Sequence, residues 1–286
     1  GFIVLALPAG LLAWRRLKAL ARDYEAKRFS DAQLLARTWW LLIVANNAVE
    51  LVSVYPGVGP LLQILGGSAA AYLMHAPLLV WALRRAYGAS ARPAPRMLLL
   101  LRVFGDTART EALFDRIASR WQLVGPVTMI AAPDVVARTV DPGDFLRFAL
   151  GNIGAGFVNS QADLEQRLAA LDQQPDPDGR YRVNEFCCRD NTWQATVVEL
   201  IQRADAVVMD LRGFSAERLG CEFELRELAA RLRAEQVVLV VDSSTDRALL
   251  ERSAMAGDAR MQVIEVERGS ARQTDAAFAA LLRAAA

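Results

Sequence analysis

Two acidic side chains, Asp210 and Glu224, stand on either side of a glycine turn in the second half of the chain. Asp210 ends the short apolar run 206–209, which is typical of a strand buried on both faces of a parallel sheet. Glu224 falls on the second turn of the following helix, whose N-cap we expect to be Ser215. A strand that stops at an acidic residue and a glycine before a helix forms the crevice in which open α/β sheets bind ligands. A carboxylate there can stabilise a positive charge that develops in a bound ligand, or trap it as a covalent intermediate.

Other interpretations of these side chains stay open at the level of sequence. Glu224 could be one solvated helix residue among several, since other glutamates are close by. Asp210 could accept hydrogen bonds from neighbouring amides, and Arg212 could lie on the surface. Trp193 could stack on a base, or could belong to the core because it opens an apolar repeat at helical spacing.

Alternating strand-like and helix-like segments from about residue 97 to the end of the chain must position these side chains. Five apolar runs are counted as strands: 97–103, 127–131, 206–209, 237–241 and 262–266. Tyr181 to Cys187 can also form a strand. Helices are expected to begin near Thr107, Asp190, Ser215, Thr245 and Thr274. The alternation predicts a five-stranded, doubly wound parallel sheet of the flavodoxin-like kind, with helices on both faces.

Residues from about 132 to 180 do not keep this rhythm, and we interpret them as an insertion. Helices are predicted near 145–150 and 164–171. The glycine-rich stretch 151–156 lacks the GxGxxG spacing and follows a helix-like stretch instead of a strand. It is therefore interpreted as a loop and not as a phosphate site.

The first 88 residues hold the excess of apolar residues, and they predict a transmembrane helical region. Two spans and one partial segment are expected: about 39–55, about 61–83, and 2–14. Positive charge at Arg37 and Arg84 predicts that both outer ends of this hairpin lie in the cytoplasm. The expected location is the cell inner membrane, multi-pass, with the lipid bilayer as a partner. A stiff linker at 89–96 then leads to a cytoplasmic α/β domain, 97–286.

Polar residues inside the expected spans require a reason, because lipid offers them no partner. Asn46, Asn47 and His75 could hydrogen-bond between helices and support oligomer contacts, or they could line a polar pore. Glu50 lies further along the first span.

The net charge of the chain and the spacing of its cysteines argue against two classes of ligand, nucleic acids and metal ions. The formal net charge of +1 lacks the basic footprint of nucleic-acid binding, so no nucleic acid is expected. The three cysteines lack metal-site spacing and the chain has a single histidine, so no metal site is expected. Thiols in a reducing cytosol are the preferred interpretation of the cysteines.

Two loops resemble TIR domains. The first is the strand-to-helix opening Phe104-Gly105-Asp106-Thr107-Ala108-Arg109, and the second contains Ser215, Cys221, Glu224 and Leu225. The resemblance covers about residues 97–268 and implies a TIR-like fold, from which the insertion departs. In NAD-cleaving TIR domains the glutamate of this pattern is catalytic, which implies that role for Glu224.

The second loop is also similar to the pattern of nucleoside deoxyribosyltransferases, in which an aspartate precedes a glycine and then a glutamate four residues later. Asp210, Gly220 and Glu224 match that pattern. Both resemblances therefore imply chemistry at an N-glycosidic bond, and both assign it to the same glutamate.

The resemblance implies that NAD is the substrate and that no separate cofactor is needed. Residues expected to bind it are Phe104, Gly105, Asp106, Arg109, Trp193, Asp210, Gly213 and Ser215. Asp106 could hold a ribose hydroxyl, Arg109 could pair with a phosphate, and amides after Gly105 or Gly213 could meet phosphate at a helix N-terminus.

The function that follows is a membrane-anchored, NAD-cleaving TIR-like protein, a bacterial defence effector activated by self-association. A homo-oligomer formed through the TIR-like domain and the membrane helices is expected. The alternative is a domain without catalysis that senses a nucleotide or binds another TIR domain, and so controls the helices.

Overall fold

The computed structural model describes residues 14–15, 17–54, 58–87, 94–102, 107–131, 157–189, 191–252, 262–266 and 271–285. The chain divides into two compact units. The first unit comprises Gly1–Ala91, Val140–Ile153 and Asp176–Arg180. The second comprises Arg92–Thr139, Gly154–Pro175 and Tyr181–Ala286.

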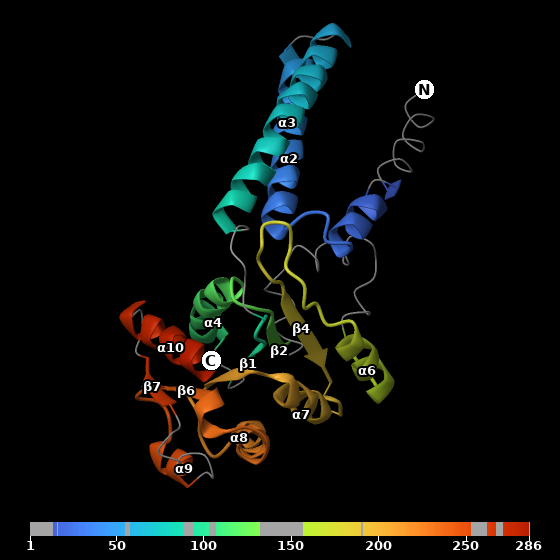
Figure 1. The fold of residues 1–286 in the computed structure, drawn as a ribbon. Coiled ribbons are helices and arrows are strands. Elements are labelled where there is room, and N and C mark those ends of the chain that lie inside the picture. The colour runs from blue at the N-terminus through green and yellow to red at the C-terminus, as the bar shows by residue number, and fades with distance from the viewer. Residues whose placement is uncertain are drawn as a thin grey trace. The chain divides into compact units, whose positions relative to one another are not determined.

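A parallel sheet of seven strands forms the centre of the second unit (Figure 1). Its strands are β1 (Leu98–Arg102), β2 (Val127–Ala131), β3 (Phe157–Val158), β4 (Val183–Cys188), β5 (Ala206–Asp210), β6 (Val237–Val241) and β7 (Gln262–Glu265). The order across the sheet is β3-β4-β2-β1-β5-β6-β7, and each neighbouring pair is parallel. The expected α/β fold with a parallel sheet is confirmed.

The expected count of five strands is wrong, because β3 and β4 complete the sheet on one side. β4 carries charged and amide residues in its first half, where its side chains are only partly buried. β3 has two residues, too few to show a periodic pattern, and it lies in the stretch interpreted as an insertion. The described part of that stretch also holds α6 (Gln161–Ala169), capped by Ser160, whose side chain accepts from the Asp163 amide.

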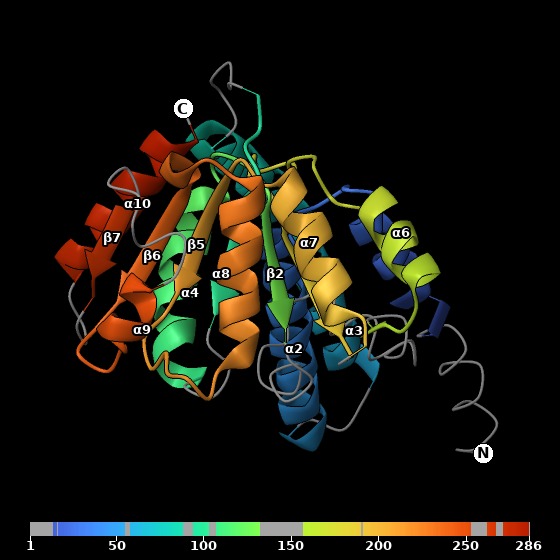
Figure 2. The same cartoon turned by 90° about the horizontal axis from the view of Figure 1, so that it is seen from below.

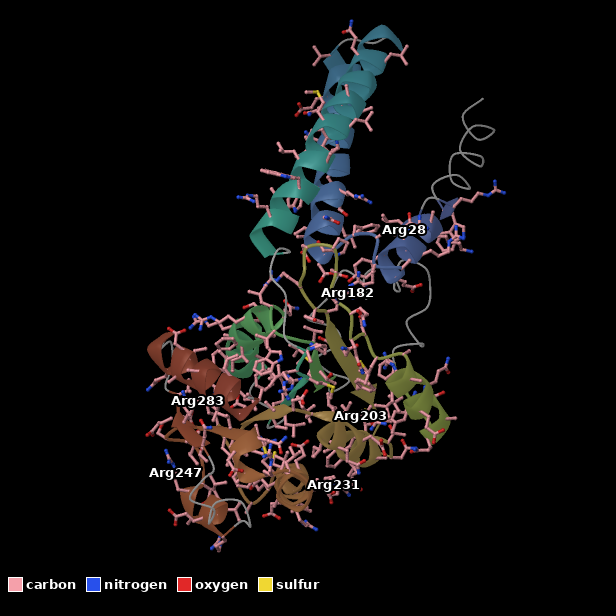
Figure 3. The ribbon with its side chains drawn as sticks, viewed as in Figure 1. Arg28, Arg182, Arg203, Arg231, Arg247 and Arg283 are labelled. Atoms are coloured by element: carbon pink, nitrogen blue, oxygen red, sulfur yellow. The ribbon has the colours of Figure 1, made fainter. Side chains whose placement is uncertain are left out.

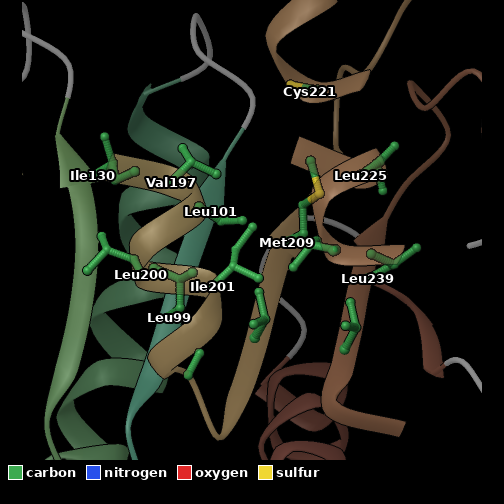
Figure 4. Close-up of a cluster of buried hydrophobic side chains, with 14 of the residues drawn as sticks. Leu99, Leu101, Ile130, Val197, Leu200, Ile201, Met209, Cys221, Leu225 and Leu239 are labelled. Carbon is green, nitrogen blue, oxygen red and sulfur yellow. The ribbon is translucent and has the colours of Figure 1, made fainter. Parts of the chain in front are cut away.

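Helices cover both faces of the sheet (Figure 2). They are α4 (Thr107–Trp121), α7 (Trp193–Arg203), α8 (Leu219–Arg231), α9 (Arg247–Glu251) and α10 (Ala271–Ala284). Side chains alternate along each strand. In β1, Leu99 and Leu101 pack with α7 and α8, whereas Leu98 and Leu100 pack with α4 and α10. Figure 4 shows the first of these clusters between the sheet, α7 and α8.

The turn from α4 into β2 approaches the segment before β1 closely at Gly125. A Cβ atom placed on Gly125 would lie 2.1 Å from the Arg96 carbonyl oxygen. The Trp121 indole N–H donates to that same oxygen over 2.9 Å, which holds the Arg96 backbone in place. Glycine is therefore required here by a close approach of two backbone segments.

Gly125→Ala is expected to lower the free energy of unfolding by about 3 kcal/mol or more, because the added methyl overlaps backbone atoms that cannot turn aside. Gly220→Ala, in α8, is the matched control. Its Cβ would meet the Trp193 ring at 3.6 Å, an ordinary contact, so it should be neutral or stabilising by up to about 1 kcal/mol. Urea unfolding followed by circular dichroism measures both, and equal effects would contradict the packing described.

The first unit contains a pair of helices, α2 (Asp31–Val54) and α3 (Val58–Tyr87), that lie side by side (Figure 1). A capping box begins α2: the Gln33 amide donates to the Ser30 hydroxyl oxygen, and the Ser30 amide donates to Gln33 Oε1. The chain before α2 packs against the start of that helix in a small core of Ala21, Tyr24, Phe29 and Leu34.

The expectation of membrane spans is not supported by these helices. Among the residues that the structure describes, no helix is both long and apolar enough to cross a membrane. α2 contains Asn46, Asn47 and Glu50, and α3 contains Gln63 and His75, polar side chains for which lipid offers no partner. The expected multi-pass inner-membrane location is therefore contradicted.

Several sequence predictions fall where the structure gives no description. They are the partial segment up to residue 13, most of the linker at 89–93, the helix near 145–150 and the glycine-rich loop 151–156. These lie outside the described residues.

Candidate functional site

The order of the strands places a ligand-binding position between β1 and β5. From β1 the chain moves to β2 and β4 on one side, and then returns to β5 on the other side of β1. Such a reversal is the switch point at which open α/β sheets bind ligands, outside the carboxyl ends of the strands. Arg102 and Asp210 end these two strands and are partners in the register, so they mark this position.

Asp210 and Arg212 form a buried ion pair at the end of β5. Arg212 Nε donates to Asp210 Oδ1 over 2.8 Å, and a terminal nitrogen of Arg212 contacts Oδ2 at 2.7 Å. The Asp210 side chain is 1% exposed and that of Arg212 is 8% exposed. Asp210 Oδ1 also accepts from the Arg212 amide. The suggestion that Arg212 lies on the surface is therefore wrong: its guanidinium neutralises Asp210 and fixes the start of the loop.

The loop after β5 turns at Gly213, whose φ of 76° favours glycine. The next loop of the sheet braces it. The Gly213 amide donates to the Ser244 hydroxyl oxygen over 3.0 Å, and the Thr245 hydroxyl donates to the Leu211 carbonyl over 2.9 Å. Ser244 is itself held by Asp242, which accepts from its amide and hydroxyl.

Sequence reasoning missed this bracing loop, Asp242 to Asp246, although a signal for it was present. Aspartate and hydroxyl residues clustered directly after an apolar strand are typical of side chains that hydrogen-bond nearby backbone. Their role here is to hold the turn at Gly213 and so to fix where α8 begins.

Glu224 lies on the second turn of α8, as predicted, and its carboxyl group is buried at 3% exposure. Its Oε2 atom has no hydrogen-bond partner among the described residues. Burial raises the pKa of this carboxyl to about 8, because a low-dielectric surrounding disfavours the charged form. The alternative of a solvated helix glutamate is therefore wrong. A buried carboxyl with an open acceptor and a strongly raised pKa is typical of functional sites.

Cys221, one turn before Glu224, is a buried thiol. Burial is the main reason that its pKa rises to about 12, and the neighbouring charges of Glu224 and Asp210 add to this effect while Arg218 opposes it. A thiol with this pKa is protonated at neutral pH and is a poor nucleophile. Of these two side chains, only the Glu224 carboxyl is suited to chemistry, and Cys221 packs beside it. Figure 4 shows Cys221 on α8 above Met209.

Trp193 packs against the same helix. Its ring meets Phe223 edge-on, with centroids 5.3 Å apart at 76°, and it lies next to Gly220. Gly220 and Glu224 are four residues apart and so share one side of α8. Trp193 is partly buried and packs against the core, which favours its interpretation as a core residue. Its ring lies against the side of α8 that carries Gly220.

Ser215 does not cap α8, contrary to the sequence prediction. The N-cap is Arg218, because the Ser215 carbonyl accepts from the Arg218 amide over 2.9 Å and a further turn precedes the helix. Phe104, Gly105 and Asp106 lie outside the described residues, as does the side chain of Arg109 in α4. The structure thus places Asp210 and Glu224 close enough to the Cys221 thiol for both charges to raise its pKa. Gly213 lies in the loop between β5 and α8, and Trp193 lies against Gly220.

Arg203 and Arg231, which Figure 3 labels, differ from Arg212 in that their ion pairs are partly exposed. Arg203 pairs with Glu199 and Arg231 with Glu227, each one turn apart on its helix, and these side chains are partly exposed. Such pairs contribute little to stability. The buried pair at the end of β5 is therefore a feature of the site and not of the general surface.

Within the described part of the chain no group of three or more histidine, cysteine or acidic residues could hold a metal ion. No protein-family model matches the chain, and no curated protein does so either.

Proposed function

We propose that the α/β domain cleaves the N-glycosidic bond between nicotinamide and ribose in NAD, with Glu224 as the catalytic carboxylate. The observation that carries this proposal is the buried Glu224 carboxyl, with its open Oε2 atom, on the helix that follows the acidic end of β5. The resemblance to NAD-cleaving TIR domains at the same residue supports it.

The raised pKa of Glu224 suits a cationic substrate. In the free protein the carboxyl is mostly neutral at pH 7. The pyridinium ring of NAD carries a positive charge, and an opposite charge nearby favours the ionised form. The carboxylate that results faces the substrate in a low-dielectric surrounding, where its field is strong. Binding of substrate would therefore generate the active form of the residue.

The bond-breaking step requires little further assistance. The electron pair of the C–N bond moves to the ring nitrogen, so nicotinamide leaves as a neutral molecule and needs no general acid. The remaining ribosyl cation is stabilised by Glu224 or trapped by it as an ester, and water then adds to the same carbon. One carboxylate and a ribose-binding pocket are sufficient for this reaction.

Binding roles follow from the position of each loop. The Gly213 amide donates to Ser244 and the Phe214 amide donates to the Leu211 carbonyl, so the amides that would meet phosphate are those from Ser215 onward. The β1–α4 loop would supply Asp106 to ribose, and the start of α4 would supply Arg109 to phosphate. Asp210 acts as a positioning residue, because its carboxylate is engaged by Arg212. The biological role that goes with this activity is a bacterial defence effector activated by self-association.

Release of nicotinamide from NAD by the purified full chain tests the proposal. Chromatography measures nicotinamide and ADP-ribose over a range of protein concentrations, because a site completed by self-association would gain activity with concentration. NAD binding without release at any concentration, observed by calorimetry, would instead support a nucleotide-sensing domain.

The pH profile gives a separate prediction. Since burial raises the pKa of Glu224 to about 8 and the ionised form acts on substrate, kcat/KM should rise with pH and level off above that pKa. The slope below it should approach about tenfold per pH unit. Nicotinamide release measured from about pH 6 to about pH 9 reports this profile, with circular dichroism to check folding. A profile that falls over this range would contradict a carboxylate role.

A further inference from the structure

One face of α2 exposes apolar side chains at helical spacing. The exposed fraction is 59% for Trp39, 52% for Ile43 and 65% for Val54, and Leu42 beside them is 57% exposed. Residues spaced by three and four positions share one side of a helix. An exposed apolar stripe of this length is unusual on an isolated chain and marks an interaction surface.

The same stripe carries two amides at its centre. Asn46 and Asn47 are exposed, and Glu50 follows one turn later, also exposed. A carboxamide both donates and accepts, so an amide pair can satisfy an identical pair on another copy. A purely apolar partner would leave these groups without hydrogen bonds, which carries a large cost. The chemistry of the stripe is therefore complementary to itself.

The size of the stripe fits a stable contact between two chains. The stripe runs for about four turns along α2, from Trp39 to Val54, so a second helix can lie along its whole length. A single asparagine pair at such a helical seam is known to fix register and the number of chains.

We propose that this stripe, defined by Trp39, Leu42, Ile43, Asn46, Asn47, Glu50 and Val54, is the contact through which two copies of the chain associate. Asn46 and Asn47 pair with the same residues of the second copy, and Glu50 accepts from an amide of that copy. The apolar residues toward each end of the stripe exclude water from the polar centre.

Charge substitution at the centre of the stripe tests the proposal on the full chain. Light scattering after size exclusion should give twice the mass of one chain for the wild type. In Asn46→Asp/Asn47→Asp, like charges would face each other, and association should weaken by at least about 100-fold. The control is Gln166→Asp/Gln202→Asp, two exposed amides on α6 and α7, which should remain dimeric.

A pair of variants with opposite charges tests whether the partner that binds the stripe is a second copy of the chain. Differently tagged Asn46→Asp/Asn47→Asp and Asn46→Lys/Asn47→Lys chains should form a mixed dimer when combined, because opposite charges then meet. A wild-type chain that is monomeric, or that floats with phosphatidylcholine vesicles as a monomer, would overturn the proposal. A dimer unaffected by the paired aspartates would overturn it as well.

Oxidative cross-linking through introduced cysteines tests the contact between the two α2 helices independently. Trp39→Cys alone should cross-link if the two α2 helices run parallel, and Trp39→Cys/Val54→Cys should do so if they run antiparallel. The native cysteines are all buried and give little background. A dimer that cross-links in neither variant would show that another surface joins the chains. These measurements do not depend on NAD cleavage, so each proposal can fail without the other.

Discussion

Glu224→Gln is expected to abolish release of nicotinamide from NAD, with kcat reduced by at least about 1,000-fold. Glutamine keeps the shape and the hydrogen-bonding capacity of the side chain but cannot become a carboxylate. The ribosyl cation would then lose the charge that stabilises or traps it. Nicotinamide release from NAD under saturating substrate measures the effect.

Glu222→Gln is the matched control, because it makes the same change two residues earlier on α8, at a partly exposed position. It should retain wild-type activity within about twofold, since exposed groups of this kind contribute little. A Glu224→Gln variant that keeps a tenth or more of the activity would contradict the assignment of Glu224 as the catalytic residue.

The free energy of unfolding, measured against pH, shows whether the Glu224→Gln variant is folded. The raised pKa of Glu224 sets the direction in which this free energy should differ from that of the wild type. In the folded chain Glu224 keeps its proton up to about pH 8, whereas in the unfolded chain it loses the proton near the ordinary pKa of a glutamate side chain. The folded state therefore binds more protons between these values, and wild-type stability falls as pH rises through this window. Glutamine removes this loss. The variant should gain about 3 kcal/mol relative to wild type between pH 5 and pH 8.

The parallel sheet could be predicted from sequence because its central strands are continuous apolar runs. Residues 206–209 and 237–241 are buried on both faces, and such strands require no alternation of polar residues. Edge strands give a weaker signal. β3 has two residues, too few for a pattern. β4 lies where 181–187 is predicted as a possible strand, but its partly buried first half keeps it out of the count of five.

The position of Glu224 on α8 could be predicted, but its burial could not. Several glutamates lie on this helix, and only the packing of α8 against the sheet separates Glu224 from Glu222. The wrong prediction that Ser215 caps α8 has a similar cause, because the sequence does not show which backbone groups are already hydrogen-bonded. Ser215 has the right residue type for an N-cap, but its carbonyl oxygen is used by a turn that precedes the helix.

Apolar composition misled the interpretation of α2 and α3. Their runs of leucine, valine and alanine predicted two spans, but no helix among the described residues is both long and apolar enough to cross a membrane. The exposed stripe on α2 accounts for the same residues as a contact between chains, in which Asn46 and Asn47 have partners.

Arg212 illustrates a residue whose environment no local pattern predicts. An arginine in a turn after a strand is usually solvated, whereas the side chain of this one is buried in its pair with the Asp210 carboxylate. Its substitution therefore has the largest expected effect on stability in the α/β domain.

Arg212→Ala is expected to lower the free energy of unfolding by about 3–5 kcal/mol, because it leaves the charge of Asp210 buried without its guanidinium partner. The control is Arg203→Ala, which breaks the exposed pair with Glu199 and should cost about 0.5 kcal/mol or less. Urea unfolding at pH 7 measures both variants under the same conditions.

The double variant Asp210→Asn/Arg212→Ala separates the buried charge from lost packing. Asparagine has nearly the shape of aspartate without its charge, so the double variant should recover about half or more of the stability lost in Arg212→Ala. A double variant as unstable as Arg212→Ala would assign the loss to the hydrogen bonds and packing of the arginine. Equal losses for Arg212→Ala and Arg203→Ala would mean that the pair at the end of β5 is hydrated in solution. In that case the loop after β5, and with it the start of α8, would not be held by Asp210.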